Sequence, residues 1–346
     1  MISLVVDGQY GDTGKGKVAA YLASMGIDYS VRGGSVNAGH TVGKYKFSQI
    51  PCAALFPGIQ LRIAAGAMVD PETFLKEVNA YGVQDRIKID ANAGVIEPRH
   101  RQEEEVDASG SAKAIGTTRK GIGPARIDRM RRVGAKLAKD VPELSPYVQE
   151  NVAEELYAAH LNQGRIVVEG VQGYNLSLFH GTFPYVTTID TTASELMSEV
   201  GLGPRLADRI YLVFKAYITR VGEGPLSNEI SFEEAERRGI AEIATVSRRN
   251  RRSALLFDSN GNPNEPEFAR MRNAVIANSP TDIVITCLDK LFPQDAGKKS
   301  GLSDEAVGFL ERYWNELYKS PSILHESRAP ISLVGTGPEI YETARL

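Results

Sequence analysis

The residues whose types and spacing most clearly indicate chemistry lie in a glycine-rich loop near the N-terminus. The apolar stretch Ile2 to Val6 leads into Gly11 to Lys17, which reads Gly-Asp-Thr-Gly-Lys-Gly-Lys. Such a loop after a strand lets successive backbone amides point at one anion, so the pattern is typical of a phosphate-binding site. A carboxylate inside such a loop repels its ligand unless it holds a cation or transfers a proton. We therefore interpret Asp12 as a residue that takes part in the chemistry.

The same loop differs from the P-loop of many nucleotide-binding proteins. A P-loop has serine or threonine directly after its Gly-Lys pair, and that hydroxyl holds Mg²⁺. Here Gly16 follows Lys15, so another oxygen must coordinate the metal. Asp12 supplies the nearest carboxylate, which is a ligand that Mg²⁺ prefers. A plain turn after a strand is the alternative interpretation of this segment.

A second glycine-rich segment follows the next apolar stretch and contains a histidine. Residues Asn37 to Thr41 read Asn-Ala-Gly-His-Thr. His40 is a candidate general acid, because histidine titrates near neutral pH and the glycine-rich surroundings are similar to those of Asp12. The remaining histidines are interpreted as structural side chains; they are His100, His160, His180 and His325.

Two further loops carry groups that suit a nucleotide. Ile115 to Pro124 is rich in glycine and threonine and precedes a basic stretch that ends at Arg132. Hydroxyl groups together with arginine suit a phosphate monoester. Gln172 lies between glycines after another apolar stretch, and its amide can both donate to and accept from a purine edge. A glutamine in an ordinary turn is the alternative.

Two later segments suggest an anionic substrate and a guanine base. Thr245 to Arg252 contains four arginines within five residues, a density that costs repulsion unless bound anions offset it. A dicarboxylate would do so, whereas a solvated basic loop is the alternative. Asp289 follows a strand and could accept from both N1–H and the 2-amino group of guanine, which would select GTP. A helix cap or a turn is the alternative for Asp289.

The elements that must position these loops have an alternating pattern. Apolar stretches alternate with helical ones, which predicts an α/β fold with a mostly parallel central sheet flanked by helices and ligands at the carboxyl ends of the strands. We expect a single domain over residues 1–346. The expected strands are 2–6, 29–32, 61–65, 86–89, 165–169, 212–216 and 283–288, and the expected helices are 17–25, 71–80, 152–161 and 268–278.

Composition narrows the class of protein. The chain has 346 residues, 42% hydrophobic and 24% charged, with a net charge of -3, so binding to nucleic acid or to a membrane is not expected. Cys52 and Cys287 are far apart and without metal-ligand spacing, which indicates buried thiols in a reducing, cytoplasmic compartment. The acidic run Glu103 to Glu105 is interpreted as a solvated face.

The order and spacing of the motifs resemble those of the adenylosuccinate synthetase family. The resemblance covers essentially the whole chain, and the short length is similar to that of the compact archaeal and bacteriophage members. The motifs that carry it are Gly11 to Lys17, Asn37 to Thr41, Ile115 to Pro124, Glu169 to Gly173, His180 to Thr187, Thr219 to Gly222, Thr245 to Arg252 and Thr336 to Pro338.

The resemblance implies a homodimeric, GTP-dependent ligase. Such an enzyme joins L-aspartate to C6 of a purine nucleoside monophosphate through a 6-phosphoryl intermediate. By this resemblance Asp12 abstracts the N1 proton, His40 donates a hydrogen bond or proton to the phosphates, and Lys15 neutralises the transferring phosphoryl group. Asp12 and the carbonyl of Gly39 would hold Mg²⁺.

The resemblance also implies contacts for each substrate. Those for GTP are Gly14, Lys15, Gly16, Lys17, Gly39, His40, Thr41, Asp289, Gly335 and Gly337. Those for the purine monophosphate are Asp12, Asn37, Thr118, Gln172, Thr187, Val221 and Arg249, together with Arg132 of the neighbouring subunit. Those for L-aspartate are Thr245, Ser247, Arg249 and Arg251.

Departures from the family pattern bear on the acceptor. Thr13 stands where the family has glutamate and Cys287 where it has lysine. In the arginine-rich segment, one register places Arg248 where the family has glycine; a register shifted by one matches Ser247 to that glycine and leaves Asn250 in an arginine position. These changes resemble the bacteriophage branch, which makes N6-succinyl-2-aminoadenylate from dGMP, whereas Asp12 and Asp289 are retained as in the rest of the family. We therefore predict GMP or dGMP as the acceptor, with IMP as the alternative. A GTP-binding switch without ligase activity is a more remote alternative.

Overall fold

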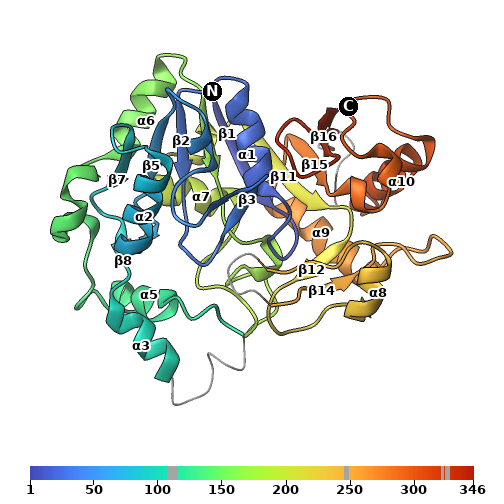
Figure 1. Cartoon of the computed structure of the whole chain (residues 1–346), viewed down its shortest axis with the longest axis horizontal. Coiled ribbons are helices and arrows are strands. Elements are labelled where there is room, and N and C mark those ends of the chain that lie inside the picture. The colour runs from blue at the N-terminus through green and yellow to red at the C-terminus, as the bar shows by residue number, and fades with distance from the viewer. Residues whose placement is uncertain (107–115, 245–248, 321–322, 324–327) are drawn as a thin grey trace.

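A ten-stranded sheet forms the centre of the molecule (Figure 1). The computed structural model describes residues 1–106, 116–244, 249–320, 323 and 328–346. The strand order is β17-β16-β15-β11-β1-β10-β2-β5-β7-β9, and every neighbouring pair is parallel except β16 with β17. The strands are β1 (Ile2–Asp7), β2 (Tyr29–Arg32), β5 (Gln60–Ile63), β7 (Ile87–Asp90), β9 (Val148–Gln149), β10 (Ile166–Glu169), β11 (Arg209–Lys215), β15 (Asp282–Thr286), β16 (Ile331–Gly335) and β17 (Thr343–Arg345). The predicted fold class is confirmed.

Helices cover both faces of this sheet. Alternate residues of β1 belong to different layers: Leu4 is part of the apolar cluster that includes residues of α6, α7, α9 and α10, whereas Val5 is part of the cluster that includes α1. Helix α2 covers β5 and β7 on the α1 side. The helices are α1 (Lys15–Ser24), α2 (Pro71–Tyr81), α3 (Pro98–Val106), α5 (Ile122–Arg131), α6 (Val152–Leu161), α7 (Ala193–Val200), α8 (Phe232–Arg237), α9 (Glu265–Asn278) and α10 (Asp304–Leu317).

Three small sheets lie around the central one. A three-stranded sheet has the order β12-β14-β13, and the pairs β3 with β4 and β6 with β8 form the others. Their strands are β3 (His40–Val42), β4 (Tyr45–Phe47), β6 (Met68–Val69), β8 (Gly94–Val95), β12 (Ile218–Arg220), β13 (Glu229–Ile230) and β14 (Arg252–Ala254). Over the described ranges, every helix is too short or too polar to cross a membrane.

Several boundaries differ from the expected ones for physical reasons. Strand β11 begins at Arg209 rather than Leu212, because its first three residues, although not fully buried, pair with Ser3, Leu4 and Val5 of β1. Strand β15 ends at Thr286, since Cys287 has a φ of 57° and starts a turn. Helix α5 begins at Ile122, inside the segment expected to be a loop. Helix α10 and the antiparallel edge formed by β17 were not expected.

The start of helix α1 differs from the starts of α2 and α6, and resembles that of α5, which also follows a glycine with a positive φ. Asp70 caps α2 and Asn151 caps α6 with side-chain hydrogen bonds to backbone amides. Gly14 precedes α1 with a φ of 85°, and the described part of the chain supplies no side-chain cap there. The first amides of α1 are therefore available to a ligand.

A substitution in the central sheet tests this packing. Leu212 of β11 is completely buried, so Leu212→Ala should lower the free energy of unfolding by about 2–5 kcal/mol. Leu161, which is 60% exposed at the end of α6, is the matched control, and Leu161→Ala should change it by less than about 0.5 kcal/mol. Urea denaturation measures both values, and equal losses would contradict the assigned layers.

Candidate active site

Two adjoining cavities lie at the carboxyl ends of the central strands. The first has a volume of about 640 Å³ and the second about 290 Å³. Loops that follow β1, β2 and β10 line the first cavity, as expected for ligands of a parallel sheet. The residues that line both cavities are Asp12, Lys15, Gly39 and His40. The three predicted catalytic residues therefore lie at the boundary between the cavities.

The first glycine-rich loop is held by a buried carboxylate at the end of β1. Asp7 accepts hydrogen bonds from Thr13 Oγ1 at 2.5 Å and from Lys15 Nζ at 2.9 Å. Lys15 also donates to the backbone carbonyl of Gln172 at 2.6 Å. Asp12 itself has a φ of 56°, and its side chain is 28% exposed. Asp7 and the Gln172 carbonyl thus hold Lys15 in place, while Asp12 lines both cavities.

A buried ionic network orients His40. Arg32 Nη1 and His40 Nδ1 both lie 2.5 Å from Glu169 Oε1. The register of the sheet explains this contact, because Glu169 of β10 pairs directly with Arg32 of β2. Since Nδ1 donates to Glu169, Nε2 is the nitrogen left for a ligand, and it is buried without a hydrogen-bond partner among the described residues.

Burial and the neighbouring charges decide the protonation of this network. Burial, aided by Arg32, lowers the pKa of His40 from 6.5 to about 4. Burial would raise the pKa of Glu169, but the facing His40 and Arg32 outweigh it and lower that pKa to about 2. His40 is therefore neutral at pH 7 in the ligand-free chain. The proton donation predicted for Nε2 requires that an anionic ligand first favours the protonated ring.

The same network contains a thiol, but its charge does not suit a metal ion. Ligand atoms of His40, Cys52 and Glu169 lie within 4.8 Å of one another. Cys52 Sγ is 3.3 Å from Glu169 Oε1. However, the guanidinium of Arg32 contacts both Glu169 and His40, and its positive charge opposes a cation. The hard oxygen donors that suit Mg²⁺ are instead the carboxylate of Asp12 and the carbonyl of Gly39, both on the cavity boundary.

The arginine-rich segment corrects one interpretation. Arg251 forms ion pairs with Glu242 and, at 3.2 Å, with Asp12, and Arg252 pairs with Glu229. Lys215 joins the group through a 2.8 Å contact with Glu242. For Arg251 and Arg252, carboxylates of the chain itself therefore offset part of the repulsion that the sequence pattern attributed to bound anions.

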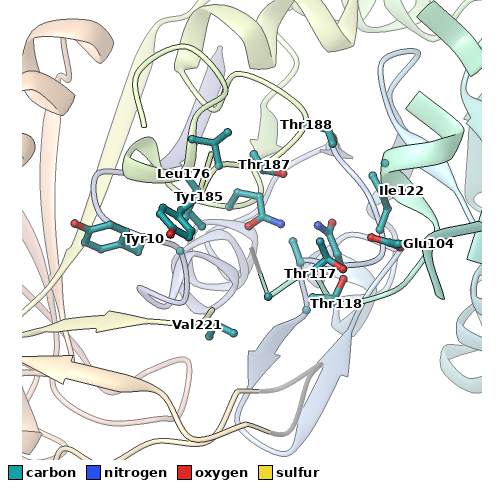
Figure 2. Close-up of a pocket in the computed structure, with 18 of the residues that line it drawn as sticks. Tyr10, Glu104, Thr117, Thr118, Ile122, Leu176, Tyr185, Thr187, Thr188 and Val221 are labelled. Carbon is teal, nitrogen blue, oxygen red and sulfur yellow. The ribbon is translucent and has the colours of Figure 1, made fainter. Parts of the chain in front are cut away.

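The first cavity has two chemically different ends. Figure 2 shows Tyr10, Leu176 and Tyr185 at one side, with Thr188, Ile122 and Glu104 at the other. The apolar and aromatic groups at the first end suit a base. Thr117, Thr118 and Thr187 lie between this end and the one with Ile122 and Glu104, and their hydroxyl groups suit a phosphate. Glu103 and Glu105 are exposed, which agrees with the interpretation of the acidic run as a solvated face. Glu104 departs from it, because it is half-buried, lines this cavity and accepts from the backbone amide of Gly121 at 2.6 Å.

Most of the predicted site residues line one cavity or the other. The first cavity contains Asp12, Asn37, Thr118, Gln172, Thr187 and Val221. The second contains Gly14, Lys15, Gly16, Lys17, Gly39, His40, Thr41, Arg251 and Gly337. Cys287, predicted to be buried, is only partly buried and also lines the second cavity.

The remaining predicted residues lie elsewhere. Arg249, Asp289 and Gly335 line neither cavity, although Asp289 lies two residues from Cys287. Arg132 is exposed at the end of α5, outside the cavities of its own chain. Thr245 and Ser247 lie outside the described residues.

Sequence reasoning assigned no role to four buried or half-buried charged side chains. Glu169 holds His40 and Asp7 holds Lys15. Lys215 holds Glu242, which in turn pairs with Arg251. Each of Asp7, Glu169 and Lys215 is the last residue of a strand. A polar residue at or just after the end of a strand was the signal used for Asp289, and the same signal was present for these three residues.

The glycine-rich loop between β1 and α1 and the cavities at the carboxyl ends of the strands are typical of a nucleotide-binding α/β protein, and the two cavities meet at Asp12, Lys15 and His40. The sequence pattern of the family described as adenylosuccinate synthetase matches residues 4–142 and 139–296. The adenylosuccinate synthetase of Archaeoglobus fulgidus is 39% identical over 98% of this chain and 96% of the relative. That of Thermococcus onnurineus is 41% identical over 97% and 96%. The chain belongs to the adenylosuccinate synthetase family and is a GTP-dependent carbon–nitrogen ligase.

Solved structures agree with this assignment. A fully ligated adenylosuccinate synthetase from Plasmodium falciparum aligns with a TM-score of 0.84 at 20% identity over 100% of this chain and 99% of that one, which supports the fold. Succinoaminodeoxyadenylate synthetase (PurZ) of cyanophage S-2L, bound to dGMP and to dATP as an energy donor, aligns with a TM-score of 0.77 at 28% identity over 99% and 95%.

The lowered pKa of His40 predicts a pH-dependent stability. Because that pKa is about 4 in the folded chain and 6.5 in the unfolded one, unfolded chains bind the proton more tightly between these values. The stabilisation is complete above pH 6.5 and is lost as the pH falls toward 4. In His40→Asn the free energy of unfolding should depend less on pH in this window, as urea denaturation would measure. An unchanged slope would contradict the assignment.

Proposed function

We propose that this chain transfers the γ-phosphoryl group of GTP to O6 of a 6-oxopurine nucleoside monophosphate and then exchanges it for the amine of L-aspartate. The observation that carries the proposal is the boundary shared by the two cavities. The second cavity is formed by the glycine-rich loop and the start of α1, which suits the triphosphate. The first cavity suits the acceptor, so the phosphoryl group crosses the boundary at Asp12, Lys15 and His40.

Each boundary residue has a role that its position supports. Asp12 takes the N1 proton, which makes O6 of the purine nucleophilic. Lys15 neutralises charge on the transferring phosphoryl oxygens. His40 directs Nε2 at the same point, because Glu169 engages its other nitrogen. Mg²⁺, held by Asp12 and the Gly39 carbonyl, would supply further positive charge to the phosphates when bound.

L-Aspartate is proposed to bind beside Arg251, with Arg249, Thr245 and Ser247 as its further contacts. In the ligand-free chain Arg251 contacts Asp12, the proposed base. A substrate carboxylate can replace Asp12 as the partner of Arg251, since the two anions have the same chemistry. Binding of L-aspartate would then release Asp12 from this ion pair. Asp289, Gly335 and the other GTP contacts predicted from the sequence remain part of the proposal.

For the acceptor we propose dGMP or GMP, which gives N6-succinyl-2-amino(deoxy)adenylate. Acceptor choice depends on a few site residues rather than on overall likeness. Thr13 and Cys287 line the second cavity, on the side proposed for the triphosphate, so they support this choice only through their resemblance to the bacteriophage branch. The PurZ structure, which is 28% identical, holds dGMP. IMP is the second candidate, favoured by the identity of 39% and 41% to archaeal adenylosuccinate synthetases over nearly the whole chain.

An acceptor comparison tests this proposal. L-Aspartate-dependent phosphate release from GTP is measured with IMP, GMP and dGMP at equal concentrations. Higher kcat/KM for dGMP or GMP than for IMP is the expected result, and the reverse order would make IMP the acceptor. Asp12→Asn should lower kcat by roughly 10²- to 10⁴-fold, the usual contribution of a general base. GTP hydrolysis without L-aspartate and without any acceptor would indicate a switch instead.

Mixed dimers test the proposed contribution of Arg132 to the neighbouring subunit. Arg132→Ala and Asp12→Asn homodimers should each be nearly inactive. If Arg132 acts on the partner's site, a heterodimer of the two variants has one site with both native residues, and about half the wild-type activity per dimer should return. Tandem-tag purification isolates the heterodimer for assay. Activity no higher than that of the parent variants would contradict the shared site.

A further inference from the structure

Asp7 uses its two carboxylate oxygens for different contacts. Oδ1 accepts from the backbone amides of Gln9 at 2.7 Å and Gly11 at 3.4 Å, and so shapes the loop. Oδ2 accepts from the side chains of Thr13 and Lys15. The carboxylate is completely buried, and a Cβ on Gly173 would come within 2.6 Å of Oδ1. Both oxygens of Asp7 therefore accept from donors of the chain itself, and the backbone of Gly173 lies close to Oδ1.

Lys15 retains one donor after its contacts within the chain. A lysine ammonium has three N–H donors. One is directed at Asp7 and a second at the carbonyl of Gln172, at 2.9 Å and 2.6 Å. Lys15 is only 3% exposed, yet it lines both cavities. The third donor is therefore left for a ligand at the boundary where they meet.

We propose that Asp7 is a positioning residue for Lys15: it holds the ammonium so that the remaining N–H points at the phosphoryl group being transferred. Thr13 supports Asp7 by donating a hydrogen bond to it. The inference rests on the proposed function for the role of Lys15. The carboxylate does not touch the substrate and acts only through Lys15. Thr13, which stands where the family pattern has glutamate, is explained by this contact, because a hydroxyl can donate to Asp7 whereas a second carboxylate would repel it.

The charge balance favours this arrangement over a purely structural one. Oδ1 alone satisfies the backbone amides that shape the loop, and a neutral side chain could do the same. The anionic Oδ2 is needed only because Lys15 brings a buried positive charge beside it. With this partner in place, Lys15 is held at the cavity boundary without a ligand and requires no reorganisation when the phosphate arrives.

A double-mutant cycle separates positioning from structural support. Asp7→Asn keeps the shape of the side chain and removes its charge, and should lower kcat by about 10- to 100-fold while KM for GTP changes less than about threefold. In the background of Lys15→Met, Asp7→Asn should lower kcat no further, because there is no ammonium left to position. Equal losses in the presence and absence of Lys15 would overturn the proposal.

Thr13→Val provides a second variant if Asp7→Asn fails to fold. It removes the hydroxyl that donates to Asp7 and keeps the shape and the charge of the Asp7–Lys15 pair. A loss of kcat in the same direction but smaller, about 3- to 10-fold, is expected. Thr13→Ser, which restores the donor, should recover wild-type kcat. Equal kcat for the valine and serine variants would count against the proposal.

A measurement independent of turnover distinguishes this inference from the proposed function. Trace acetylation with acetic anhydride, read by mass spectrometry, reports how firmly Lys15 is held, and exposed Lys76 is the internal reference. In Asp7→Asn the labelling of Lys15 relative to Lys76 should rise at least about threefold. Unchanged labelling would overturn the positioning role even in an active enzyme. A wild-type chain inactive with every acceptor, but with the expected labelling, would instead refute the proposed function alone.

Discussion

The site depends on a row of polar residues that is removed from water at one edge of the central sheet. The last residue of each of five adjacent strands is polar and at most 3% exposed; in sheet order these are Thr286, Lys215, Asp7, Glu169 and Arg32. Burial of such charges is unfavourable unless each finds a partner of opposite sign. Segments beyond the strands provide Lys15 for Asp7 and Glu242 for Lys215, whereas Glu169 and Arg32 neutralise each other within the row and Glu169 also accepts a hydrogen bond from His40. The need to neutralise this row therefore fixes the positions of the side chains that line the cavities.

This constraint also explains why the two cavities meet where they do. Asp7, Glu169 and Lys215 end the strands β1, β10 and β11, which are neighbours in the sheet. Each carries a different part of the site: Asp7 holds the phosphate loop, Glu169 holds the histidine, and Lys215 with Glu242 holds Arg251. Parallel strands with a common direction bring these groups to one edge, although the chain between Asp7 and Lys215 contains most of the other elements. A small shift of one strand would therefore disturb all three groups together.

The sequence alone predicted the features that depend on local patterns. The parallel sheet followed from alternating apolar and helical stretches, and the glycine-rich loops followed from residues that stand directly after strands. The pairing of Glu169 with Arg32 was not predictable in this way, because 137 residues separate the partners and only the sheet register joins them. Likewise, the contact of Arg251 with Asp12 depends on how β14 folds back beside the phosphate loop. Periodicity recognises elements, but it carries no information about which charges will neutralise one another.

The uncapped start of helix α1 links ligand binding to the integrity of the core. Alpha-helical amides at this end have no side-chain acceptor within the described chain, and Val18, Ala19 and Leu22 of the same helix pack directly on the central strands. A triphosphate that accepts from these amides would complete the helix in the way that Asp70 completes α2. The bound nucleotide would then raise the free energy of unfolding, since any ligand that binds only the folded chain shifts the folding equilibrium by mass action. In a cell, the lifetime of this protein against unfolding and proteolysis would accordingly follow the supply of purine triphosphate, which couples its abundance to the pool that it consumes.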